Sequence, residues 1–507
     1  MCKIGKGIKM LFGAFLACGI LFSGKNAALA NTMETAIPMV AGQTVAGVIP
    51  EGEESEFFVF TATENGYVSF DFAKPLSDKE SSFIMSIYDA NAIEAYESYR
   101  DTKSAFSTEQ VVVAAGNVYY LRVKNYSRGN GIDFTVTANF IPYAFVESEY
   151  NETTTTATQL VANIPTYGTS FNSKDEDCFS FVAPNNGIVT FDFTTVDMYV
   201  DFVPKWRVKV IDKFGNNIYE VCQKDASVSY VMSKGEVYYL CVSSYSKNEL
   251  KKYQITPLFQ NVTYTEKETN DSVAKATKMT IGKTYYGSLS SKQDQDFYKI
   301  TALKDGVVTI KFKDKSNNLD ASAVWNFIIY DSSKNELVNV RTTHENNTDN
   351  CGSLQYVLKK KQTIYVCLKN YSNTKNVTYS LGTSFKANKY IEKENNNTIA
   401  KATKIVTNKT YSAVLGEQKT SDYFMVKPTK SGKYKVAIRL KEDLTYPYAI
   451  RIYDSNKRVI ATSKAISLKG TLKFTATAGK KYYVEVYHAK TWYGTSSCAL
   501  YTLKVSK

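Results

Sequence analysis

The 507-residue sequence has only two histidines and none of the common short motifs of catalysis. His344-Glu345 is followed by two asparagines, so no HExxH zinc motif forms, and GxSxG, P-loop and dinucleotide-binding motifs are missing. Without a CxxC pair, two histidines cannot make a zinc site of cysteine and histidine ligands. These absences predict a protein that is not an enzyme, although a glycosidase that uses two carboxylates has no motif by which to exclude it.

Cysteine is also scarce: eight residues are too few for a disulfide framework in a chain of this length. Cys241 and Cys367 hold equivalent places in neighbouring repeats, and each has a cysteine upstream. Two interpretations stand. One is a pair of bridges, Cys222–Cys241 and Cys351–Cys367, and the other is free thiols in a protein from a reducing habitat.

Long apolar runs are limited to one, from Met10 to Phe22, which follows three lysines and precedes the small-x-small sequence Ala28-Leu29-Ala30. This pattern predicts a cleaved signal peptide over residues 1–30. The run is short for a membrane anchor, and a lipoprotein signal at Cys18 would follow a poor lipobox. We therefore expect a secreted, extracellular protein with no membrane segment after cleavage, and leave open whether it associates with the cell surface.

The rest of the chain is repetitive. The glycine that opens a hydrophobic run recurs at Gly66, Gly187, Gly306 and Gly432, with spacings of 121, 119 and 126 residues. Apolar and polar residues alternate in short runs separated by turn sequences, which is the pattern of β-strands. We predict an all-β protein of four tandem antiparallel, jelly-roll-like β-sandwich domains. Their predicted bounds are 31–146 (copy one, divergent), 147–265 (copy two), 266–391 (copy three) and 392–507 (copy four, basic).

Oxygen-bearing side chains gather twice in each of the last three copies, around a short predicted strand. Alternate residues of an extended segment point the same way, so Glu266, Glu268 and Asn270 of copy three can converge, and Asp294 and Asp296 can face them from a loop. Without a cation, such carboxylates would repel one another at close range. A hard cation is one interpretation, because Ca²⁺ takes six to eight oxygen ligands, and a solvated acidic linker is the other.

At these residues the chain resembles the bacterial pre-peptidase C-terminal domain family, whose relatives include the collagen-binding domains of clostridial collagenases. The shared pattern is E-x-E-x-N-D, A-x-x-A-T, Y-x-G-x-L and D-x-D-x-Y, strongest in copy three and weakest in copy one. The resemblance implies a jelly-roll sandwich with Ca²⁺ held between the entry segment and the D-x-D loop. The candidate ligands are Glu147, Glu149, Asn151, Asp175 and Asp177; Glu266, Glu268, Asn270, Asp271, Asp294 and Asp296; and Glu392, Glu394, Asn396 and Asp422.

The copies differ in how complete this pattern is. Copy two has Glu152 where copy three has Asp271, and copy four keeps only Asp422 because Thr420 replaces the other loop carboxylate. Copy one has Glu54 and Glu56 in the loop but no entry cluster. Whether copies one and four bind calcium is left open.

Charge is uneven along the chain. Copy one holds 7 basic and 15 acidic residues, whereas copy four holds 22 basic and 8 acidic residues. One interpretation is that copy four meets an anionic partner such as a cell-wall polymer or acidic glycan; plain solubility is the other. Nucleic acid is not an expected partner of an exported chain without a recognised motif.

Copy four also offers an aromatic row. Strand alternation over 482–488 predicts that Tyr483, Glu485 and Tyr487 face outward, and Trp492 and Tyr493 follow. Outward rings suit a protein or glycan ligand, unless a neighbouring domain covers them. We therefore expect a non-catalytic, calcium-binding protein for extracellular binding or adhesion. A calcium-stiffened spacer or envelope component, and an accessory subunit of a secreted protease, are the alternatives.

Overall fold

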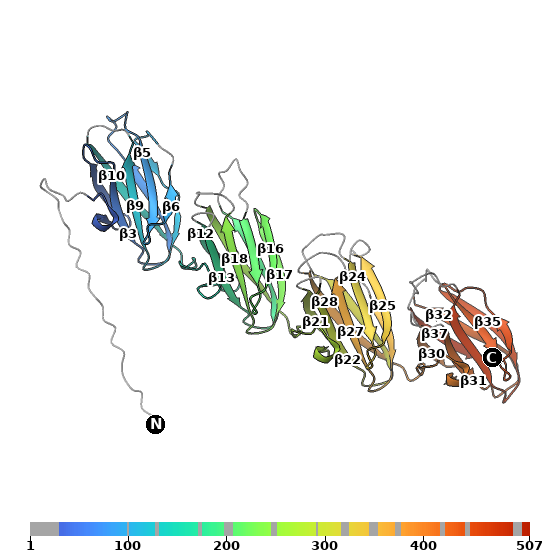
Figure 1. Cartoon of the computed structure of the whole chain (residues 1–507). Coiled ribbons are helices and arrows are strands. Elements are labelled where there is room, and N and C mark those ends of the chain that lie inside the picture. Colours follow the sequence, from blue (N-terminus) through green and yellow to red (C-terminus); the bar gives the residue numbers. More distant parts are fainter. Residues whose placement is uncertain are drawn as a thin grey trace, which may run out of the picture. The chain divides into compact units, whose positions relative to one another are not determined.

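A computed structural model describes residues 30–98, 101–126, 131–170, 175–196, 206–244, 251–289, 293–315, 324–343, 353–370, 377–415, 421–441, 447–489 and 499–507. The predicted signal peptide, Cys351, Trp492 and Tyr493 lie outside these residues. The structure confirms the predicted fold class, because strands form four two-sheet β-sandwiches, whose labelled strands can be followed in Figure 1. The predicted boundaries between copies stay predictions.

The chain divides into two compact units, and each is described by itself. The first unit ends at Phe140, and the second runs from Ile141 to Lys507 and takes in Glu64–Tyr67 and Val111–Ala115. Copy one contributes η1(Met33–Thr35), β1(Ile37–Met39), β2(Thr44–Ile49), β3(Ser55–Thr61), β4(Gly66–Ala73), β5(Phe83–Asp89), β6(Glu94–Glu97), β7(Ala105–Ser107), β8(Val111–Val113), β9(Val118–Asn125) and β10(Ile132–Pro142).

The other three sandwiches repeat one set of elements. Copy two has β11(Thr158–Gln159), β12(Thr166–Ser170), β13(Glu176–Val182), β14(Gly187–Thr195), β15(Trp206–Ile211), β16(Asn217–Gln223), β17(Ala226–Met232), β18(Val237–Ser244) and β19(Lys251–Asn261). Copy three has η2(Val273–Lys275), β20(Thr277–Lys278), β21(Thr284–Leu289), β22(Gln295–Thr301), β23(Gly306–Asp314), β24(Val324–Tyr330), β25(Glu336–Thr343), β26(Ser353–Leu358), β27(Thr363–Asn370) and β28(Val377–Ala387). Copy four has η4(Ile399–Lys401), β29(Thr403–Ile405), β30(Thr410–Leu415), β31(Ser421–Val426), β32(Gly432–Leu440), β33(Tyr448–Tyr453), β34(Val459–Thr462), β35(Lys469–Ala476), β36(Tyr482–His488) and β37(Ala499–Ser506).

Each of these sandwiches packs a five-stranded sheet on a four-stranded sheet. In copy three the orders are β20-β22-β27-β24-β25 and β21-β28-β23-β26, and copies two and four repeat them. The strands described in copy three pair antiparallel except β20 with β22, at the edge of the five-stranded sheet. The short first strand therefore lies beside the strand that carries the D-x-D loop. This arrangement brings the two ends of the acidic pattern together.

Alternation builds the core. In β14, every second residue from Gly187 to Phe193 is buried, and the residues between them are half-buried. The core of copy two is aromatic, because Trp206 and Tyr253 are fully buried there with 5.2 Å between their ring centroids. Trp325 and Tyr379 pack in the same way in copy three, at 5.7 Å. The period-two pattern thus places one large aromatic side chain from each sheet at the centre of the sandwich.

The predicted Cys222–Cys241 bridge is wrong, because Cys241 is bonded to Cys178 instead. These two cysteines are directly opposite each other on β13 and β18, with their Cα atoms 4.1 Å apart. Cys222 lies on the edge strand β16, opposite Arg207 of β15, and is a free, exposed thiol. Sequence spacing could not show this, because cross-strand register decides which cysteines meet. The predicted Cys351–Cys367 bridge cannot be followed, since Cys351 is outside the described residues.

No helix in the described part of the chain is long and apolar enough to span a membrane.

Candidate metal centre

The Glu-x-Glu-x-Asn segment that opens copies two, three and four is fastened to the sandwich by its backbone. In copy three, Glu266 N donates to Tyr286 O at 2.9 Å, and Phe297 N donates to Asn270 O at 3.1 Å. The peptide bond after the second glutamate is cis in all three copies: Glu149-Tyr150, Glu268-Thr269 and Glu394-Asn395. The entry segment is therefore held against the strands that carry the loop aspartates.

A threonine that starts the first strand holds the middle of the entry segment. Its hydroxyl accepts a hydrogen bond from the backbone N–H between the two glutamates, at 2.9 Å in each copy. In copies two and three it also accepts from the amide Nδ2 of Asn151 or Asn270, at 3.2 and 3.4 Å. In copy three Asn270 Nδ2 also donates to Glu266 Oε2, at 3.5 Å, so the nitrogen of this amide is engaged by the site. The threonines are Thr158, Thr277 and Thr403, each of which follows an alanine.

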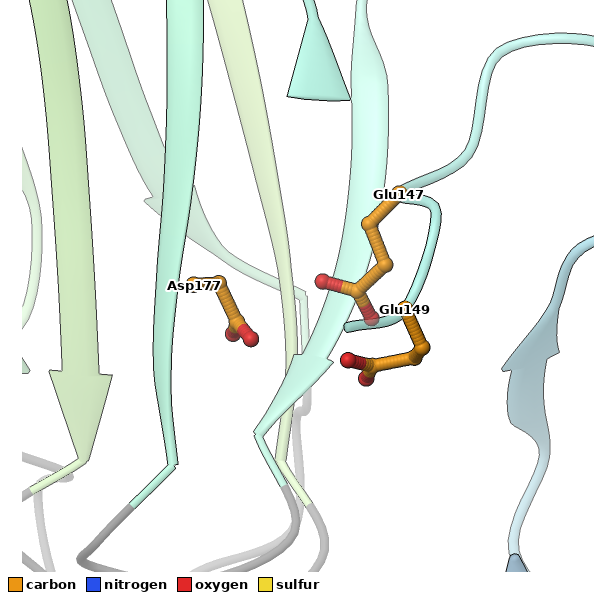
Figure 2. A group of neighbouring side chains, drawn as sticks. All are labelled: Glu147, Glu149 and Asp177. Carbon is orange, nitrogen blue, oxygen red and sulfur yellow. The ribbon is translucent and has the colours of Figure 1, made fainter. Parts of the chain in front are cut away.

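The carboxylates of copy two lie close together. Glu147, Glu149 and Asp177 each offer an oxygen within 4.8 Å of the others, and so do Glu149, Glu152 and Asp175. Figure 2 shows Glu147 and Glu149 on the entry segment facing Asp177 on β13. Glu147 and Asp177 are almost fully buried, with 2% and 0% of their surface exposed. Thr169 N donates to Glu147 Oε1, and the Tyr253 hydroxyl donates to Asp177 Oδ2 at 2.6 Å.

Copy three repeats this arrangement. Glu266, Glu268 and Asp296 form a group within the same 4.8 Å limit. Ser288 N donates to Glu266 Oε1 at 2.7 Å, and the Tyr379 hydroxyl donates to Asp296 Oδ2. The other two predicted carboxylate ligands, Asp271 and Asp294, line a cavity together with Glu268, and Asn270 lies on the entry segment described above. All six predicted residues of this copy therefore lie at one end of the sandwich.

Several buried oxygens in these clusters lack a hydrogen-bond partner among the described residues. They are Asn151 Oδ1 and Asp177 Oδ1 in copy two, Asn270 Oδ1 and Asp296 Oδ1 in copy three, and Asn396 Oδ1 in copy four. Burying a polar atom without a partner costs on the order of 1–3 kcal/mol. One amide oxygen and one carboxylate oxygen recur at matching positions of copies two and three, and these clusters could hold a cation because both oxygens can serve as its ligands. The donor set, carboxylates with an amide carbonyl, is the one Ca²⁺ prefers.

Burial and mutual repulsion keep protons on these carboxylates. Burial raises the pKa of Glu147 to about 8, with the charge of Asp175 adding to the effect, and raises the pKa of Glu268 to about 7, with Asp294 adding. Burial, with Glu147 and Glu266 as the nearest charges, raises the pKa of Asp177 and of Asp296 well above the usual range. A bound divalent cation would reverse this, since opposite charge favours the ionised form.

Sequence reasoning missed one residue of the site, a buried tyrosine from the last strand of copies two, three and four. Tyr253 and Tyr379 donate their hydroxyls to loop aspartates, and Tyr501 donates to Asp422 at 2.7 Å. In copy one, Phe134 holds the same third position of the last strand, where no hydroxyl is available. This tyrosine lies far along the chain from both acidic clusters. A comparison of the four copies at this strand position could have found it.

A glycine makes room for that tyrosine. A Cβ atom added at Gly168 or Gly287 would collide with the tyrosine ring and with the first glutamate of the site. Ala413 has the equivalent position in β30 of copy four, one residue before Val414, whose N–H binds Glu392 at 2.7 Å. Close approach of backbone to side chain therefore explains the glycine in the Y-x-G-x-L pattern.

Copies four and one hold less complete versions. Glu392, Asn396 and Asp422 are all buried, and Asn396 Nδ2 donates to Glu392 Oε2 at 3.3 Å. No group of three carboxylates with Glu394 is found within the described part of copy four. Of the two loop carboxylates of copy one, Glu54 and Glu56, only Glu56 is buried, and its Oε2 accepts a hydrogen bond from the Val48 N–H at 2.8 Å. Burial raises the pKa of Glu56 to about 7.

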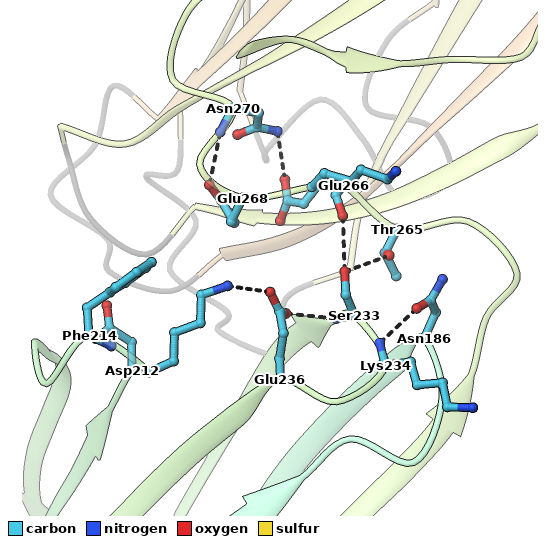
Figure 3. Close-up of polar contacts among 12 residues, drawn as sticks. Asn186, Asp212, Phe214, Ser233, Lys234, Glu236, Thr265, Glu266, Glu268 and Asn270 are labelled. Atoms are coloured by element: carbon cyan, nitrogen blue, oxygen red, sulfur yellow. Dashed lines mark hydrogen bonds and ion pairs between the residues drawn. The ribbon is translucent and has the colours of Figure 1, made fainter.

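The site of copy three faces the end of copy two. Figure 3 shows Ser233 of copy two reaching Thr265 Oγ1 at 3.3 Å and donating to Glu266 O at 3.4 Å. A cavity of about 480 Å³ lies beside these bonds, lined from copy two by Asp212, Lys213 and Glu236 among others, and from copy three by Glu268, Asp271 and Asp294. Lys213 is paired with Glu236 at 2.7 Å. The acidic end of copy three therefore contacts its neighbour through polar groups.

Of the predicted aromatic row of copy four, Tyr483 and Tyr487 lie within the described residues, and Trp492 and Tyr493 lie outside them. Tyr483 and Tyr487 are half-buried on the outer face of β36, and Arg451 lies 4.6 Å from the centroid of the Tyr487 ring. Glu485 shares this face but is only 4% exposed. The hydroxyls of Ser421, Tyr423 and Tyr453 and the guanidinium of Arg451 all donate to its carboxylate.

No known family matches the sequence, and no curated protein matches it. Among solved structures, the chain is similar to the pre-peptidase C-terminal domain of collagenase from Bacillus anthracis, with 18% identity over 20% of this chain and 93% of that one, and a TM-score of 0.18. It is also similar to the tandem CBM51 modules of a family 98 glycoside hydrolase from Streptococcus pneumoniae, with 10% identity over 44% and 83% and a TM-score of 0.16. A triple jelly roll from an archaeal virus matches at 12% identity over 66% and 82%, with a TM-score of 0.19.

Proposed function

We propose that the chain is a secreted, non-catalytic, calcium-binding protein whose tandem sandwiches serve extracellular binding or adhesion. The observation that carries the calcium part is the repeated buried asparagine amide oxygen without a partner, at Asn151, Asn270 and Asn396. Copies two and three each add a buried aspartate oxygen that also lacks a hydrogen-bond partner among the described residues, Asp177 Oδ1 and Asp296 Oδ1. A Ca²⁺ ion would pair these oxygens and offset the repulsion among the neighbouring carboxylates.

The ligand sets differ between the copies. In copy two we assign Glu147, Glu149, Asn151, Asp175 and Asp177, and in copy three Glu266, Glu268, Asn270, Asp271, Asp294 and Asp296. Copy four, with Glu392, Glu394, Asn396 and Asp422, offers fewer carboxylates and should bind more weakly. Copy one has no entry cluster, and we assign no ion to it.

The experiment is a thermal melt of the protein with excess calcium and with excess chelator. Calcium at a hundredfold excess over its Kd should stabilise the domain that holds it by about 2.7 kcal/mol. Asn270→Ala should remove the calcium-dependent shift of copy three, and Asn151→Ala that of copy two. Asn335→Ala is the matched control, because Asn335 lies in an exposed turn and donates its Nδ2 to Asp331. Melts that are identical in calcium and chelator would defeat the proposal.

A second candidate function, a calcium-stiffened spacer, is favoured by the contacts between copies. The entry segment that holds the candidate ligands of copy three also bonds to Ser233 of copy two. At the next joint the contact is apolar, since Ile391 and Val414 join the hydrophobic cluster of copy three. Calcium would then change the hydrodynamic size of the protein, and a sedimentation coefficient that is equal with and without calcium would contradict the spacer.

A further inference from the structure

The exposed face of the four-stranded sheet in copy four carries a cluster of basic side chains. Residues 434, 436, 438 and 440 of β32 point into the core, and the residues between them are on the outside. Alternation in β35 and β37 adds further cations to the same face. β32 and β35 are labelled in Figure 1. The cations of this surface, called the lysine face below, are Lys433, Lys435, Arg439, Lys469, Lys473 and Lys504, and all six are exposed.

Strand register places several of these cations side by side. Lys435 is directly opposite Lys473, and Arg439 is directly opposite Lys469. Lys504 is opposite Ala437, in the row between those two pairs. Like charges directly opposite each other destabilise a sheet. The lysine face therefore costs the fold stability, and the described residues give none of its six cations an ion-pair partner.

Protection of the sheet edge does not explain the pattern. Lysines on an edge strand prevent edge-to-edge aggregation, and β35 is an edge strand. However, Lys433, Lys435 and Arg439 lie on β32, which is paired on both sides, with β35 and with β37. These interior cations need another reason.

The face is free of acidic side chains among the described residues. Besides the cations, β32, β35 and β37 place Thr471, Thr475, Thr502, Ser506 and Ala437 there. Glu442 and Asp443, which follow β32, are outside the described residues. The described surface thus combines amines with hydroxyls and contains no aromatic ring.

The same face has a different character in copies one and two. In copy two, Thr190 pairs with Ser229 and Asp192 pairs with Ser227. In copy one, Asp71 is opposite Ser107 and accepts its hydroxyl. The fold therefore does not require cations at this face. Lys435 and Lys473 of copy four stand where copy two has Thr190 and Ser229, and Ala437 stands where copy two has Asp192. Copy three carries two exposed lysines on this face, Lys311 and Lys313.

We propose that the lysine face binds a linear polysaccharide that bears carboxylate groups. Directly opposite cations lie about 4.8 Å apart across strands. Along a strand the spacing is about 6.6 Å from Lys433 to Lys435, and about 13 Å from Lys435 to Arg439 and from Lys469 to Lys473. A chain that carries many acid groups could meet several of these cations at once. Threonine and serine hydroxyls between the cations can bond sugar hydroxyls. Five of the six cations are lysines, whose flexible ammonium groups can each pair with a single acid group. Without aromatic rings the face lacks a platform for stacking nucleic-acid bases.

A polysaccharide can reach only part of the four-stranded sheet of copy four, because the side formed by β30 and the start of β37 is covered. Val414 of β30 is 1% exposed because it packs into the hydrophobic cluster of copy three, and Leu500 of β37 packs against the same cluster. The polymer would therefore lie over β32 and β35. This proposal rests on the binding role proposed above, but it does not depend on calcium, since no candidate calcium ligand lies on this face.

The test is retention of the purified protein on immobilised hyaluronan, a linear carboxylated polysaccharide, measured with calcium and with chelator and at rising salt. Neutral dextran and duplex DNA are the comparison surfaces. The face variant is Lys433→Gln, Lys435→Gln, Lys473→Gln and Lys504→Gln together. The control variant removes four exposed lysines of copy four that lie off this face: Lys427→Gln, Lys464→Gln, Lys480→Gln and Lys481→Gln.

We expect hyaluronan binding that weakens with salt and falls at least about tenfold in the face variant but less than about twofold in the control variant, because charge contacts set such affinity. Equal loss in both variants would show that net charge alone acts, and would overturn the proposal. Retention on DNA but not on hyaluronan, or on neither, would also overturn it. Hyaluronan binding that persists in chelator would show that the lysine face acts without the calcium sites. A failure of the calcium proposal would be seen in a different measurement, as a missing calcium-dependent shift in the thermal melt.

Discussion

Replacing Tyr379 by phenylalanine tests how the calcium site of copy three is held. The Tyr379 hydroxyl donates to Asp296 Oδ2, and Asp296 Oδ1 is the oxygen without a partner in the described structure. The same hydroxyl lies 2.8 Å from the hydroxyl of Tyr298. The tyrosine therefore fixes one oxygen of the aspartate and so aims the other at the proposed ion.

The magnitude follows from the kind of bond that is lost. A hydrogen bond to a charged group contributes about 1.5–3 kcal/mol, and loss of an outer partner of a metal ligand typically weakens metal binding by about 10- to 100-fold. The two figures agree, since tenfold corresponds to about 1.4 kcal/mol. We expect Tyr379→Phe to weaken calcium binding in copy three by this factor while the fold is retained, because the ring remains and Phe134 is tolerated in copy one.

The assay is terbium luminescence sensitised by the buried tyrosines, with calcium as competitor. Asn151→Ala and Asn396→Ala in the background leave copy three as the site that is read out. Tyr285→Phe is the matched control, because Tyr285 is also buried in this sandwich but its hydroxyl donates to the backbone O of Lys278 at 3.2 Å. Equal calcium affinities in Tyr379→Phe and Tyr285→Phe would refute the reasoning.

Three further outcomes are expected. In chelator, the folded state holds protons on Glu147 and Glu268 up to pH values of about 8 and 7, whereas the unfolded chain loses them near 4.5; stability should therefore fall as pH rises from about 5 to 8, and the calcium-dependent rise in Tm should grow. A calcium-dependent Tm shift that is flat over this range would count against the buried cluster. Gly287→Ala should weaken calcium binding in copy three, which calorimetry would show, because its Cβ would push against the Tyr379 ring and Glu266; unaltered binding would mean that the site adjusts to a Cβ, as copy four does around Ala413. Reduction of the Cys178–Cys241 bond should lower the unfolding free energy by about 2–4 kcal/mol. In the unreduced protein an alkylating reagent should label Cys222 and spare Cys178 and Cys241; labelling of Cys178 or Cys241 would disprove the bridge.

Much of the fold could be predicted from the sequence, because it depends on patterns among residues that are close together in the chain. Alternation over β14 and its equivalents indicates strands, and equal spacing of Gly66, Gly187, Gly306 and Gly432 indicates four copies. These features need only the residues nearby in the chain.

The site was predicted only in part, for a physical reason. Glu266, Glu268 and Asn270 are near each other in the chain, so strand alternation was enough to place them together. Tyr379 reaches Asp296 from 83 residues away, and Cys178 meets Cys241 across 63 residues. Such pairs depend on cross-strand register, which one sequence does not specify. Glu485 was expected outside because alternation gives the face of a side chain but not what covers it.

Calcium titration by calorimetry at neutral pH tests the central claim most directly. We predict at least two bound ions per chain, one in copy two and one in copy three, with proton release that grows as the buffer pH falls toward the raised pKa values of Glu147 and Glu268. Asn151→Ala and Asn270→Ala should each remove one ion from the stoichiometry. Heats no larger than those of dilution, or a stoichiometry that both variants leave unchanged, would contradict the account.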